Sequence, residues 1–534
     1  MKNALRILFA ILFFLPLFAT GQIFFDTSTK GATAQLQKFT QFYRNLSNHY
    51  IDTINHERLV EDAIKEVLSE LDPHSAYLSA EEMKPVEESF SGSFSGIGIE
   101  FNVLKDTIIV VNTLPGGPSE KVGLLPNDRI VAVDARSVVG TLQRDVPKIL
   151  RGPKGTRLEI QVVRKNMPAI LTFRVVRDNI PIHTVDAAYK IDSRTGYIKV
   201  NRFAQNTMKE FVEAFLKFDK VEAFILDLRG NGGGYLDQAV QMSSFFLPRG
   251  TLITSTEGLR QQPERFTSTT HGFFQKGKLV VLIDEGSASG SEIVAGAIQD
   301  WDRGVLIGRR TFGKGLVQRQ FPLIDGSAVR ITVARYHTPT GRVIQRPFTA
   351  GDSEGYYEEH VRRIGSGADS LNTSGDQESF RTLRTGRTVY GGGGIFPDVY
   401  VPADTAGYSS YWGRLIRMGV VNEFAIHYLD RHRNEITARY PTFERYEVMF
   451  EITDAILNEL ADLGVQRGVE RDPAGLATSS RVMKIQLKAL FAQKIWTMTE
   501  YYRVANSHDP LFTRAIEIIR DWRITPEVQG IGDM

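Results

Sequence analysis

The chain has 534 residues, of which 42% are hydrophobic and 24% charged, and its formal net charge is +2. This length predicts three or four domains, and the ordinary composition excludes wholesale disorder. The near balance of 64 basic and 62 acidic residues lacks the basic footprint of a nucleic-acid binder, and the absence of cysteine excludes disulfides, thiolate nucleophiles and Cys-ligated zinc.

Residues 1–21 have the layout of a signal peptide. Lys2 and Arg6 supply a positive start, residues 7–18 are mainly apolar, and small residues follow up to Gly21. The apolar run is shorter than the ~20 residues that a membrane-spanning helix needs. We therefore expect an exported chain whose leader is cleaved, located in the periplasm or cell envelope. A retained N-terminal anchor is the alternative.

Residues 22–93 are predicted to form an N-terminal helical domain. Apolar side chains recur at three- and four-residue steps between Leu36 and Leu46, and again between Leu59 and Leu68. The segment Asp72-Pro73-His74-Ser75 ends the second helix.

Residues 94–177 predict a small β-rich domain. Short runs of β-prone residues, such as residues 108–111 and 158–163, are separated by turn signals that include Pro115-Gly116-Gly117-Pro118.

Strands and helices alternate within residues 178–405. The apolar runs at residues 221–228 and 278–283 are typical of buried strands, and helix patterns follow them at residues 236–246 and 291–299. This alternation predicts an α/β sheet that is covered on both faces.

Two further segments complete the predicted multidomain α/β chain. Residues 350–390 are polar and rich in Gly, Ser and Thr, so we interpret them as an insertion or mobile loop within the core. Residues 406–534 are helix-patterned and are predicted to form a C-terminal helical domain.

Ser289 lies between a predicted buried strand and the helix that follows it. A helix N-terminus presents free backbone N–H groups that stabilise developing negative charge, as a hydroxyl nucleophile requires. The spacing from Gly286 to Gly290 departs from the G-x-S-x-G nucleophile pattern. Serine is also a favoured helix cap, so capping stays open as the alternative role.

Lys314 stands between Gly313 and Gly315. Together with Gly308 the segment resembles a phosphate-binding loop, but Gly315 occupies the position where Ser or Thr must hold magnesium, and an extended run rather than a helix follows. A desolvated lysine with a lowered pKa can instead accept a proton from a serine hydroxyl. A soluble nucleotide-binding protein is the disfavoured alternative.

A glycine-rich loop, residues 227–234, follows the apolar run that ends at Leu228. Glycines let the backbone approach a ligand closely, and loops at the carboxyl ends of strands are where α/β sheets bind ligands. A plain flexible connection is the alternative. The sequence has no HExxH motif and no histidine beside these segments, so we expect no metal site, while a remote Ser-His-Asp triad stays open.

Taken in order, these segments resemble the carboxyl-terminal processing peptidases, also called tail-specific proteases. The resemblance covers residues from about 40 to 400. It is carried by Asp227–Gly233, Gly286–Glu292, Thr311–Gln318, Pro339–Gln345 and Gly394–Asp398.

The resemblance implies a serine endopeptidase with Ser289 as the nucleophile, Lys314 as its general base and Gln318 as the residue that orients the lysine. Positions four apart on an extended segment lie on the same face, so Lys314 and Gln318 can converge. No cofactor is implied.

The resemblance also implies an oxyanion hole made of backbone N–H groups, from Gly290 and from Gly232 or Gly233. Gly290 is a departure, since the family usually has alanine there. The N–H group is retained, so we expect little chemical consequence.

The β-rich domain is similar to a PDZ domain, with Gly96-Ile97-Gly98-Ile99 resembling its carboxylate-binding loop. A PDZ groove adds a substrate tail as an extra strand. The implied partners are protein substrates with accessible apolar C-terminal tails. Arg151 resembles a residue that couples tail binding to assembly of the active site.

The helical ends, residues 33–90 and 410–534, suggest an adaptor protein or a homo-oligomer as further partners; packing of these helices on their own domain is the alternative. The near-neutral charge indicates no nucleic-acid partner. A catalytically silent PDZ scaffold in the cell envelope is the alternative function.

Overall fold

The computed structural model describes the residues 29–104, 106–114, 116–164, 167–269, 272–366, 378–405, 407–522 and 530–531. The signal peptide predicted for residues 1–21 lies outside the described residues. The chain divides into two compact units, residues 1–67 and 68–534. Across the described part, none of the helices is both long and apolar enough to cross a membrane.

The first unit is helical, as predicted. It contains α2 (Thr29–His49) and most of α3 (His56–Ser69). Several large apolar side chains of these helices are exposed, among them Leu36, Phe39 and Phe42.

The second unit begins with a short strand and a helix, β1 (Ala76–Leu78) and α4 (Ala80–Ser91). The helical periodicity did not reveal β1, because three residues are too few to show a strand pattern. This strand pairs antiparallel with residues 328–330 of the peptidase-like core.

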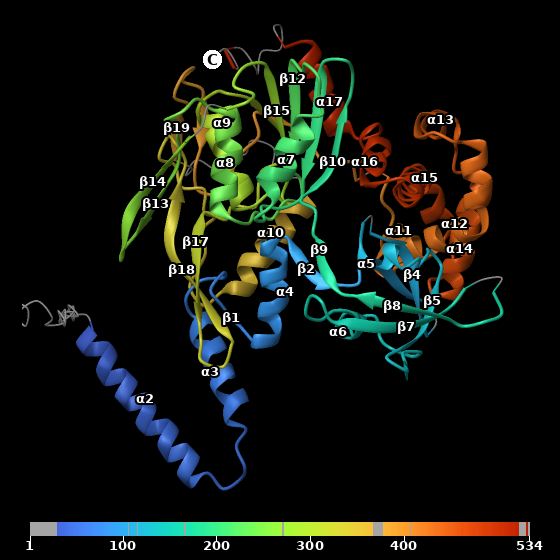
Figure 1. The fold of residues 1–534 in the computed structure, drawn as a ribbon. Helices are drawn as coiled ribbons and strands as arrows, with labels where there is room; N and C mark the ends of the chain where they lie inside the picture. Colours follow the sequence, from blue (N-terminus) through green and yellow to red (C-terminus); the bar gives the residue numbers. More distant parts are fainter. Residues whose placement is uncertain are drawn as a thin grey trace, which may run out of the picture. The chain divides into compact units, whose positions relative to one another are not determined.

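The PDZ-like domain is a β-sheet with two short helices (Figure 1). The main sheet has the order β3-β4-β5-β7-β8, with β6 paired to β5, while β2 and β9 form a separate ribbon. The elements are β2 (Ser93–Gly96), β3 (Ile99–Leu104), β4 (Thr107–Thr113), α5 (Pro118–Lys121), β5 (Arg129–Val133), β6 (Arg136–Ser137), α6 (Val146–Leu150), β7 (Arg157–Val163), β8 (Leu171–Val176) and β9 (Asp178–Pro181).

The central sheet of the core has six strands in the order β10-β11-β12-β15-β16-β21, parallel except for β10 against β11. Its strands and helices are β10 (Val185–Lys190), β11 (Thr195–Val200), α7 (Thr207–Phe215), β12 (Ala223–Asp227), α8 (Leu236–Phe246), β15 (Lys278–Ile283), α9 (Gly290–Asp300), β16 (Val305–Gly308) and β21 (Val399–Tyr400).

A second, antiparallel sheet has the order β1-β18-β13-β14, with β17 also paired to β18. Its core strands are β13 (Leu252–Gly258), β14 (Gln261–Thr267), β17 (Leu316–Pro322) and β18 (Ala328–His337).

The C-terminal segment is helical, as predicted. It contains α11 (Ser410–Arg417), α12 (Val420–Arg439), α13 (Phe443–Met449), α14 (Asp454–Gln466), α15 (Pro473–Ile495), α16 (Met498–Asn506) and α17 (Pro510–Arg520).

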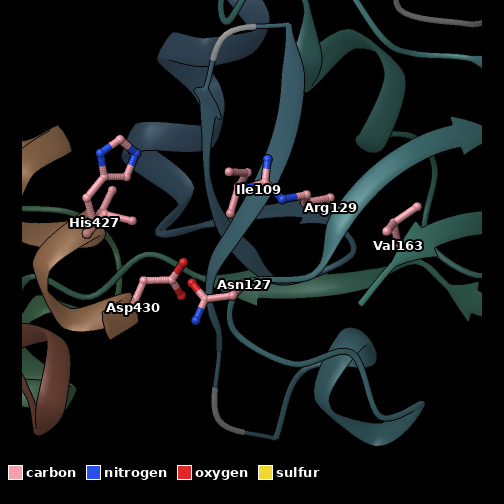
Figure 2. A pocket seen from close by; sticks show the side chains of 7 residues that line it. Ile109, Asn127, Arg129, Val163, His427 and Asp430 are labelled. Carbon is pink, nitrogen blue, oxygen red and sulfur yellow. The ribbon is translucent and has the colours of Figure 1, made fainter. Parts of the chain in front are cut away.

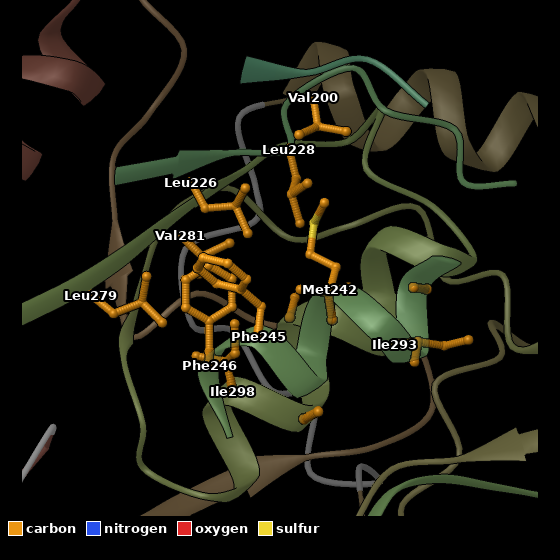
Figure 3. Close-up of a cluster of buried hydrophobic side chains, with 14 of the residues drawn as sticks. Val200, Leu226, Leu228, Met242, Phe245, Phe246, Leu279, Val281, Ile293 and Ile298 are labelled. Carbon is orange, nitrogen blue, oxygen red and sulfur yellow. The ribbon is translucent and has the colours of Figure 1, made fainter. Parts of the chain in front are cut away.

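Alternating side chains of the central strands bury opposite faces of the sheet. Leu226 and Val281 pack with Met242 and Phe245 of α8 and with residues of α9 (Figure 3). The other face, which includes Ile225, is covered by α17. The sheet is therefore sandwiched, as predicted, but one layer comes from the end of the chain.

The described parts of the polar segment 350–390, residues 350–366 and 378–390, contain regular secondary structure where a loop was predicted. It contains α10 (Ser353–Ser366) and a hairpin of β19 (Ser379–Arg381) with β20 (Thr388–Tyr390). Tyr356 of α10 is buried, and Arg346 stacks on its ring at 3.9 Å from the centroid. Aromatic and cation–π packing therefore anchors a segment whose composition alone indicates a loop.

A cavity of about 320 Å³ separates the PDZ-like sheet from α12. Figure 2 shows His427 and Asp430 of α12 on one side and Asn127 and Arg129 on the other. Ile109 also lines it and is buried, so α12 shields the outer face of this sheet.

Candidate active site

Ser289 is the N-cap of α9 and has a strained backbone, with φ 54° and ψ −110°. A positive φ is costly for a residue with a Cβ and is found at active sites where surrounding structure enforces it. Ser289 is half-buried while Ala288 and Gly290 on either side are buried. The turn therefore has the strained strand-to-helix geometry of a nucleophile, even though the G-x-S-x-G spacing is absent.

The glycine loop packs directly against this turn. A Cβ on Gly233 would lie 2.7 Å from the Ser289 Cβ and 2.9 Å from the Gly290 nitrogen. The Asn231 carbonyl accepts hydrogen bonds from the Ala288 N–H at 3.0 Å and the Ser291 hydroxyl at 2.8 Å. Glycine at position 233 is therefore required for the two segments to touch, and the loop is not a plain flexible connection.

The two loop glycines differ in their N–H groups. The Gly233 N–H donates to the Asn231 side chain at 2.9 Å. Among the hydrogen bonds of the described residues, none engages the N–H of Gly232 or of Gly290. Gly290 opens α9, where helix geometry leaves N–H groups without partners. Of these two loop glycines, Gly232 is therefore the one whose N–H group has no hydrogen bond among the described residues.

A buried carboxylate, Glu292, joins the serine turn to the lysine loop. One of its oxygens accepts the N–H of Ser289 and of Lys314, each at 2.8 Å. The other accepts the Gly313 N–H at 2.8 Å and the Thr311 hydroxyl at 2.5 Å. Because one oxygen binds both N–H groups, the backbones of Ser289 and Lys314 lie within the reach of two hydrogen bonds.

Sequence reasoning gave Glu292 no role, although a signal for it was present. Ser289-x-x-Glu292 is the S-x-x-E spacing in which a carboxylate returns to the N–H of the helix cap. Burial raises the pKa of Glu292, while its hydrogen bonds act in the opposite direction.

Lys314 is partly buried, and burial lowers its pKa below the ordinary value of 10.5. The nearby charge of Arg330 lowers the pKa further, whereas Glu292 and Asp72 raise it. Within the described residues no carboxylate forms an ion pair with its ammonium group. These surroundings favour the neutral amine, the form that accepts a proton.

Gln318 lies on β17, but a register shift between Val317 and Gln318 interrupts the regular alternation. Its side-chain amide donates to the Thr332 hydroxyl at 3.5 Å, and that hydroxyl donates to Asp72 at 3.0 Å. Gln318 therefore shares with Lys314 a neighbourhood that includes Asp72. Sequence reasoning recognised Asp72 only as part of a helix stop, because no local pattern connects it to β17.

One histidine, His74, lies near Lys314. Burial and the Lys314 charge lower its pKa to about 4. Its ring nitrogen lies 3.3 Å from the Tyr356 hydroxyl. A histidine with so low a pKa is a poor general base for a serine hydroxyl.

The predicted carboxylate-binding loop lies between β2 and β3. The carbonyls of Ile97 and Gly98 accept hydrogen bonds from Ser119 and Leu114, each at 3.0 Å. Gly98 has a φ of 73°, a conformation that favours glycine. Ile97 is buried and Ile99 half-buried, and Gly96 packs near Phe94.

Arg151 contacts Glu88 of α4, and its guanidinium lies 4.3 Å from the centroid of the Phe94 ring. These described contacts do not include Ser289 or Lys314. Arg151 thus connects the PDZ-like domain with the helix that precedes it.

Comparison with known families divides the chain in the same order. Residues 95–175 match the PDZ domain and residues 194–354 match peptidase family S41. Residues 22–82 match the N-terminal domain of the activating protease CtpB, and residues 411–497 match a family of unknown function.

Named proteins show the same likeness. A carboxy-terminal-processing protease of Bartonella bacilliformis is 35% identical over 318 residues, which are 58% of this chain and 73% of that protein. The carboxy-terminal processing protease CtpA of Bacillus subtilis is 32% identical over 387 residues, covering 70% of this chain and 82% of the relative.

Among solved structures, the photosystem II D1 C-terminal processing protease is 29% identical with a TM-score of 0.35, over 57% of this chain and 83% of the other. On the identity and coverage of the sequence relatives, this chain belongs to the carboxy-terminal processing proteases of peptidase family S41.

Proposed function

We propose that this protease cleaves peptide bonds with a Ser289–Lys314 pair and selects its protein substrates by their apolar C-terminal tails. The observation that carries the proposal is the Glu292 carboxylate, which accepts the N–H groups of both Ser289 and Lys314. The serine turn also packs against the glycine loop, where a Cβ on Gly233 would lie 2.7 Å from the Ser289 Cβ.

The first half of the reaction forms an acyl-enzyme. The Ser289 oxygen attacks the peptide carbonyl carbon while the neutral Lys314 amine accepts the hydroxyl proton. The N–H groups of Gly290 and Gly232 stabilise the oxyanion of the tetrahedral intermediate. As the C–N bond breaks, Lys314 returns the proton to the leaving amine.

The second half releases the product acid. Lys314 accepts a proton from water, which attacks the acyl carbon, and the Ser289 oxygen leaves with a proton. Gln318, bonded to Thr332, fixes the polar surroundings in which the lysine amine is held.

Tail recognition is proposed for the PDZ-like domain. Among the described strands β3 pairs only with β4 in its sheet, so its other edge is open to an added strand. The Gly96–Ile99 loop precedes this strand and would bind the terminal carboxylate. Arg151, which now contacts Glu88, would change partners when a tail binds and so couple recognition to the catalytic groups.

Location and assembly are also proposals. We propose that residues 1–21 direct export and are then removed, leaving the protease in the periplasm or cell envelope. Exposed apolar side chains on α2, such as Leu36 and Phe39, support contact with an adaptor or a second copy. Mass spectrometry of the mature N-terminus and light scattering of the purified chain test these two points.

The main test uses a loosely folded reporter protein with an apolar C-terminal tail, with EDTA present. We expect cleavage by the parent chain and none by Ser289→Ala or Lys314→Ala, with tail binding retained by both variants. Tail binding without cleavage by the parent would favour the scaffold alternative. Cleavage that survives Ser289→Ala would refute the assignment of the nucleophile.

A further inference from the structure

The end of the chain contacts the glycine loop of the candidate active site. Arg229 directs its Nη1 to the carboxylate of Asp509, the N-cap of α17, and its Nη2 to the Asn506 side chain at 3.3 Å. The same guanidinium binds Asp227 through Nε at 3.0 Å and Nη2 at 2.6 Å. Arg229 is thus held by Asp227 of β12 on one side and by Asn506 of α16 and the N-cap of α17 on the other.

This arginine anchors the loop that carries Gly232. The Arg229 N–H donates to Asp227 at 3.0 Å, and the Lys199 amine donates to the Arg229 carbonyl. The next residue, Gly230, donates its N–H to Asp284 at 2.7 Å. These bonds fix the loop backbone at Arg229 and Gly230, and the bonds that Asn231 accepts from Ala288 and Ser291 fix the part that follows.

The position of Asp509 is itself well fixed. The α17 helix packs on the central sheet, with the Phe512 ring 5.4 Å from the ring of Tyr197. One Asp509 oxygen accepts the Leu511 N–H at 2.8 Å, and the other contacts Arg229. A rigid helix therefore presents this carboxylate to the loop.

The charges in this cluster balance. Lys199 and Arg229 are the cations, and Asp227 and Asp509 are the anions. Asp227 and Lys199 are buried, and Asp509 is the most exposed of the four side chains. Loss of the Asp509 charge would leave an unbalanced cation beside the loop, where burial makes the imbalance costly.

We propose that Asp509, assisted by Asn506, is a positioning residue that holds Arg229 so that the Gly232 N–H is aimed at the oxyanion. The inference rests on the proposed function. It gives the last two helices of the chain a part in catalysis: they complete the support of the oxyanion loop from behind.

The test is Asp509→Asn, because asparagine is also a good helix cap and keeps the volume while removing the charge. The matched control is Asp472→Asn, at the start of α15, where Asp472 accepts the Gly475 N–H at 2.8 Å and likewise precedes a proline. Three quantities are measured: kcat and KM on the tail-bearing reporter, affinity for the tail peptide, and affinity for a peptide aldehyde whose hemiacetal oxygen occupies the oxyanion position.

We expect Asp509→Asn to lower kcat by about 10-fold, less than the loss from deleting an oxyanion donor, since the donor is misaimed rather than removed. Affinity for the aldehyde should fall by a similar factor. KM and tail affinity should stay within about twofold of the parent, because the PDZ-like domain is unchanged. Asp472→Asn should match the parent in all three.

If Asp509→Asn keeps the kcat and the aldehyde affinity of the parent, the positioning role is overturned and the proposed function stands. If the parent itself is inactive, the proposed function is overturned. If kcat, tail affinity and melting temperature all fall together, the substitution damages the whole fold, and the positioning role of Asp509 is overturned. If Asp509→Asn is unfolded at the assay temperature, Asn506→Ala provides the test, with a smaller fall in kcat and aldehyde affinity at unchanged tail affinity.

Discussion

The two sides of the proposed catalytic site are built in different ways. Ser289 and the glycine loop follow neighbouring strands, β15 and β12, and are locked together by short-range bonds such as that from Ala288 to Asn231. Lys314 lies in the loop between β16 and β17, and the charges that act on it come from remote segments that include Asp72 and Arg330.

The position of Ser289 and the pKa of Lys314 therefore depend on different parts of the fold. The parallel sheet brings Ser289 and the glycine loop together, because carboxyl ends of adjacent parallel strands share one edge. The lysine depends on remote charges and burial for its pKa. We therefore expect substitutions on the serine side to alter rate through geometry, and those around the lysine to alter the pH dependence.

The largest expected loss of kcat tests whether Ser289 and Lys314 act in the same catalytic step. Ser289→Ala and Lys314→Ala should each reduce kcat by about 10⁴-fold or more, and the double variant should be little worse than the poorer single variant. Single-turnover cleavage of the reporter measures this. Losses that multiply in the double variant would contradict a shared catalytic step.

The next effect concerns the fit of the glycine loop. Gly233→Ala places a Cβ 2.7 Å from the Ser289 Cβ at a φ of 96°, so either the loop or the serine turn must move. We expect kcat to fall by about 100-fold, the scale of losing an oxyanion donor. Steady-state kinetics on the reporter checks it.

Gly232→Ala is the matched control, since a Cβ there meets nothing within 4 Å and the N–H group remains. It should keep kcat within a few fold of the parent. Equal losses in the two variants would show that the collision with Ser289 is not the cause.

A moderate effect is expected where the two sides are joined. Glu292→Gln puts an NH₂ group against N–H donors that now face a carboxylate oxygen, and leaving such groups unsatisfied costs about 1–3 kcal/mol each. Both activity and melting temperature should fall. Calorimetry alongside kinetics measures the two losses.

The control for this substitution is Glu82→Gln, at the same position of the cap that begins α4, where Glu82 accepts the Ser79 N–H at 2.9 Å. It should reduce stability less and leave kcat unchanged. A Glu292→Gln variant that loses stability but keeps kcat would show that the link between the two loops is not needed for catalysis.

The smallest expected effect is a shift in the pKa of Lys314. Since burial and Arg330 lower the Lys314 pKa, kcat/KM of the parent should rise with pH, and the midpoint of this rise should lie below pH 10.5. Arg330→Gln removes a positive neighbour, so the protonated lysine becomes more favourable and the midpoint should move to higher pH, by about one unit or less. Arg335→Gln, exposed on the same strand, should leave the midpoint in place.

The hydrophobic pattern within a single segment was enough to predict individual strands and helices. A continuous apolar run predicted β15, and a helix pattern predicted α8, with the observed bounds Lys278–Ile283 and Leu236–Phe246. The cover of the second sheet face was not predictable, because α17 has the same amphipathic pattern whether it packs on its own domain or on the core.

The candidate site was likewise predictable only in part. Ser289, Lys314 and the glycine loop could be selected from residue types and order, but not the difference between Gly232 and Gly233, which depends on the Asn231 side chain. The proximity of Asp72 to Lys314 and of Asp509 to Arg229 arises from tertiary folding, and no spacing in the sequence reports it.

The most direct test of the central claim is to trap the acyl-enzyme. The mature chain is mixed with a tail-bearing ester substrate, quenched in acid and examined by peptide mass spectrometry. The account predicts one acyl group per chain, on Ser289, and none in Lys314→Ala. Steady turnover with no adduct on Ser289, or an adduct on another residue, would contradict it.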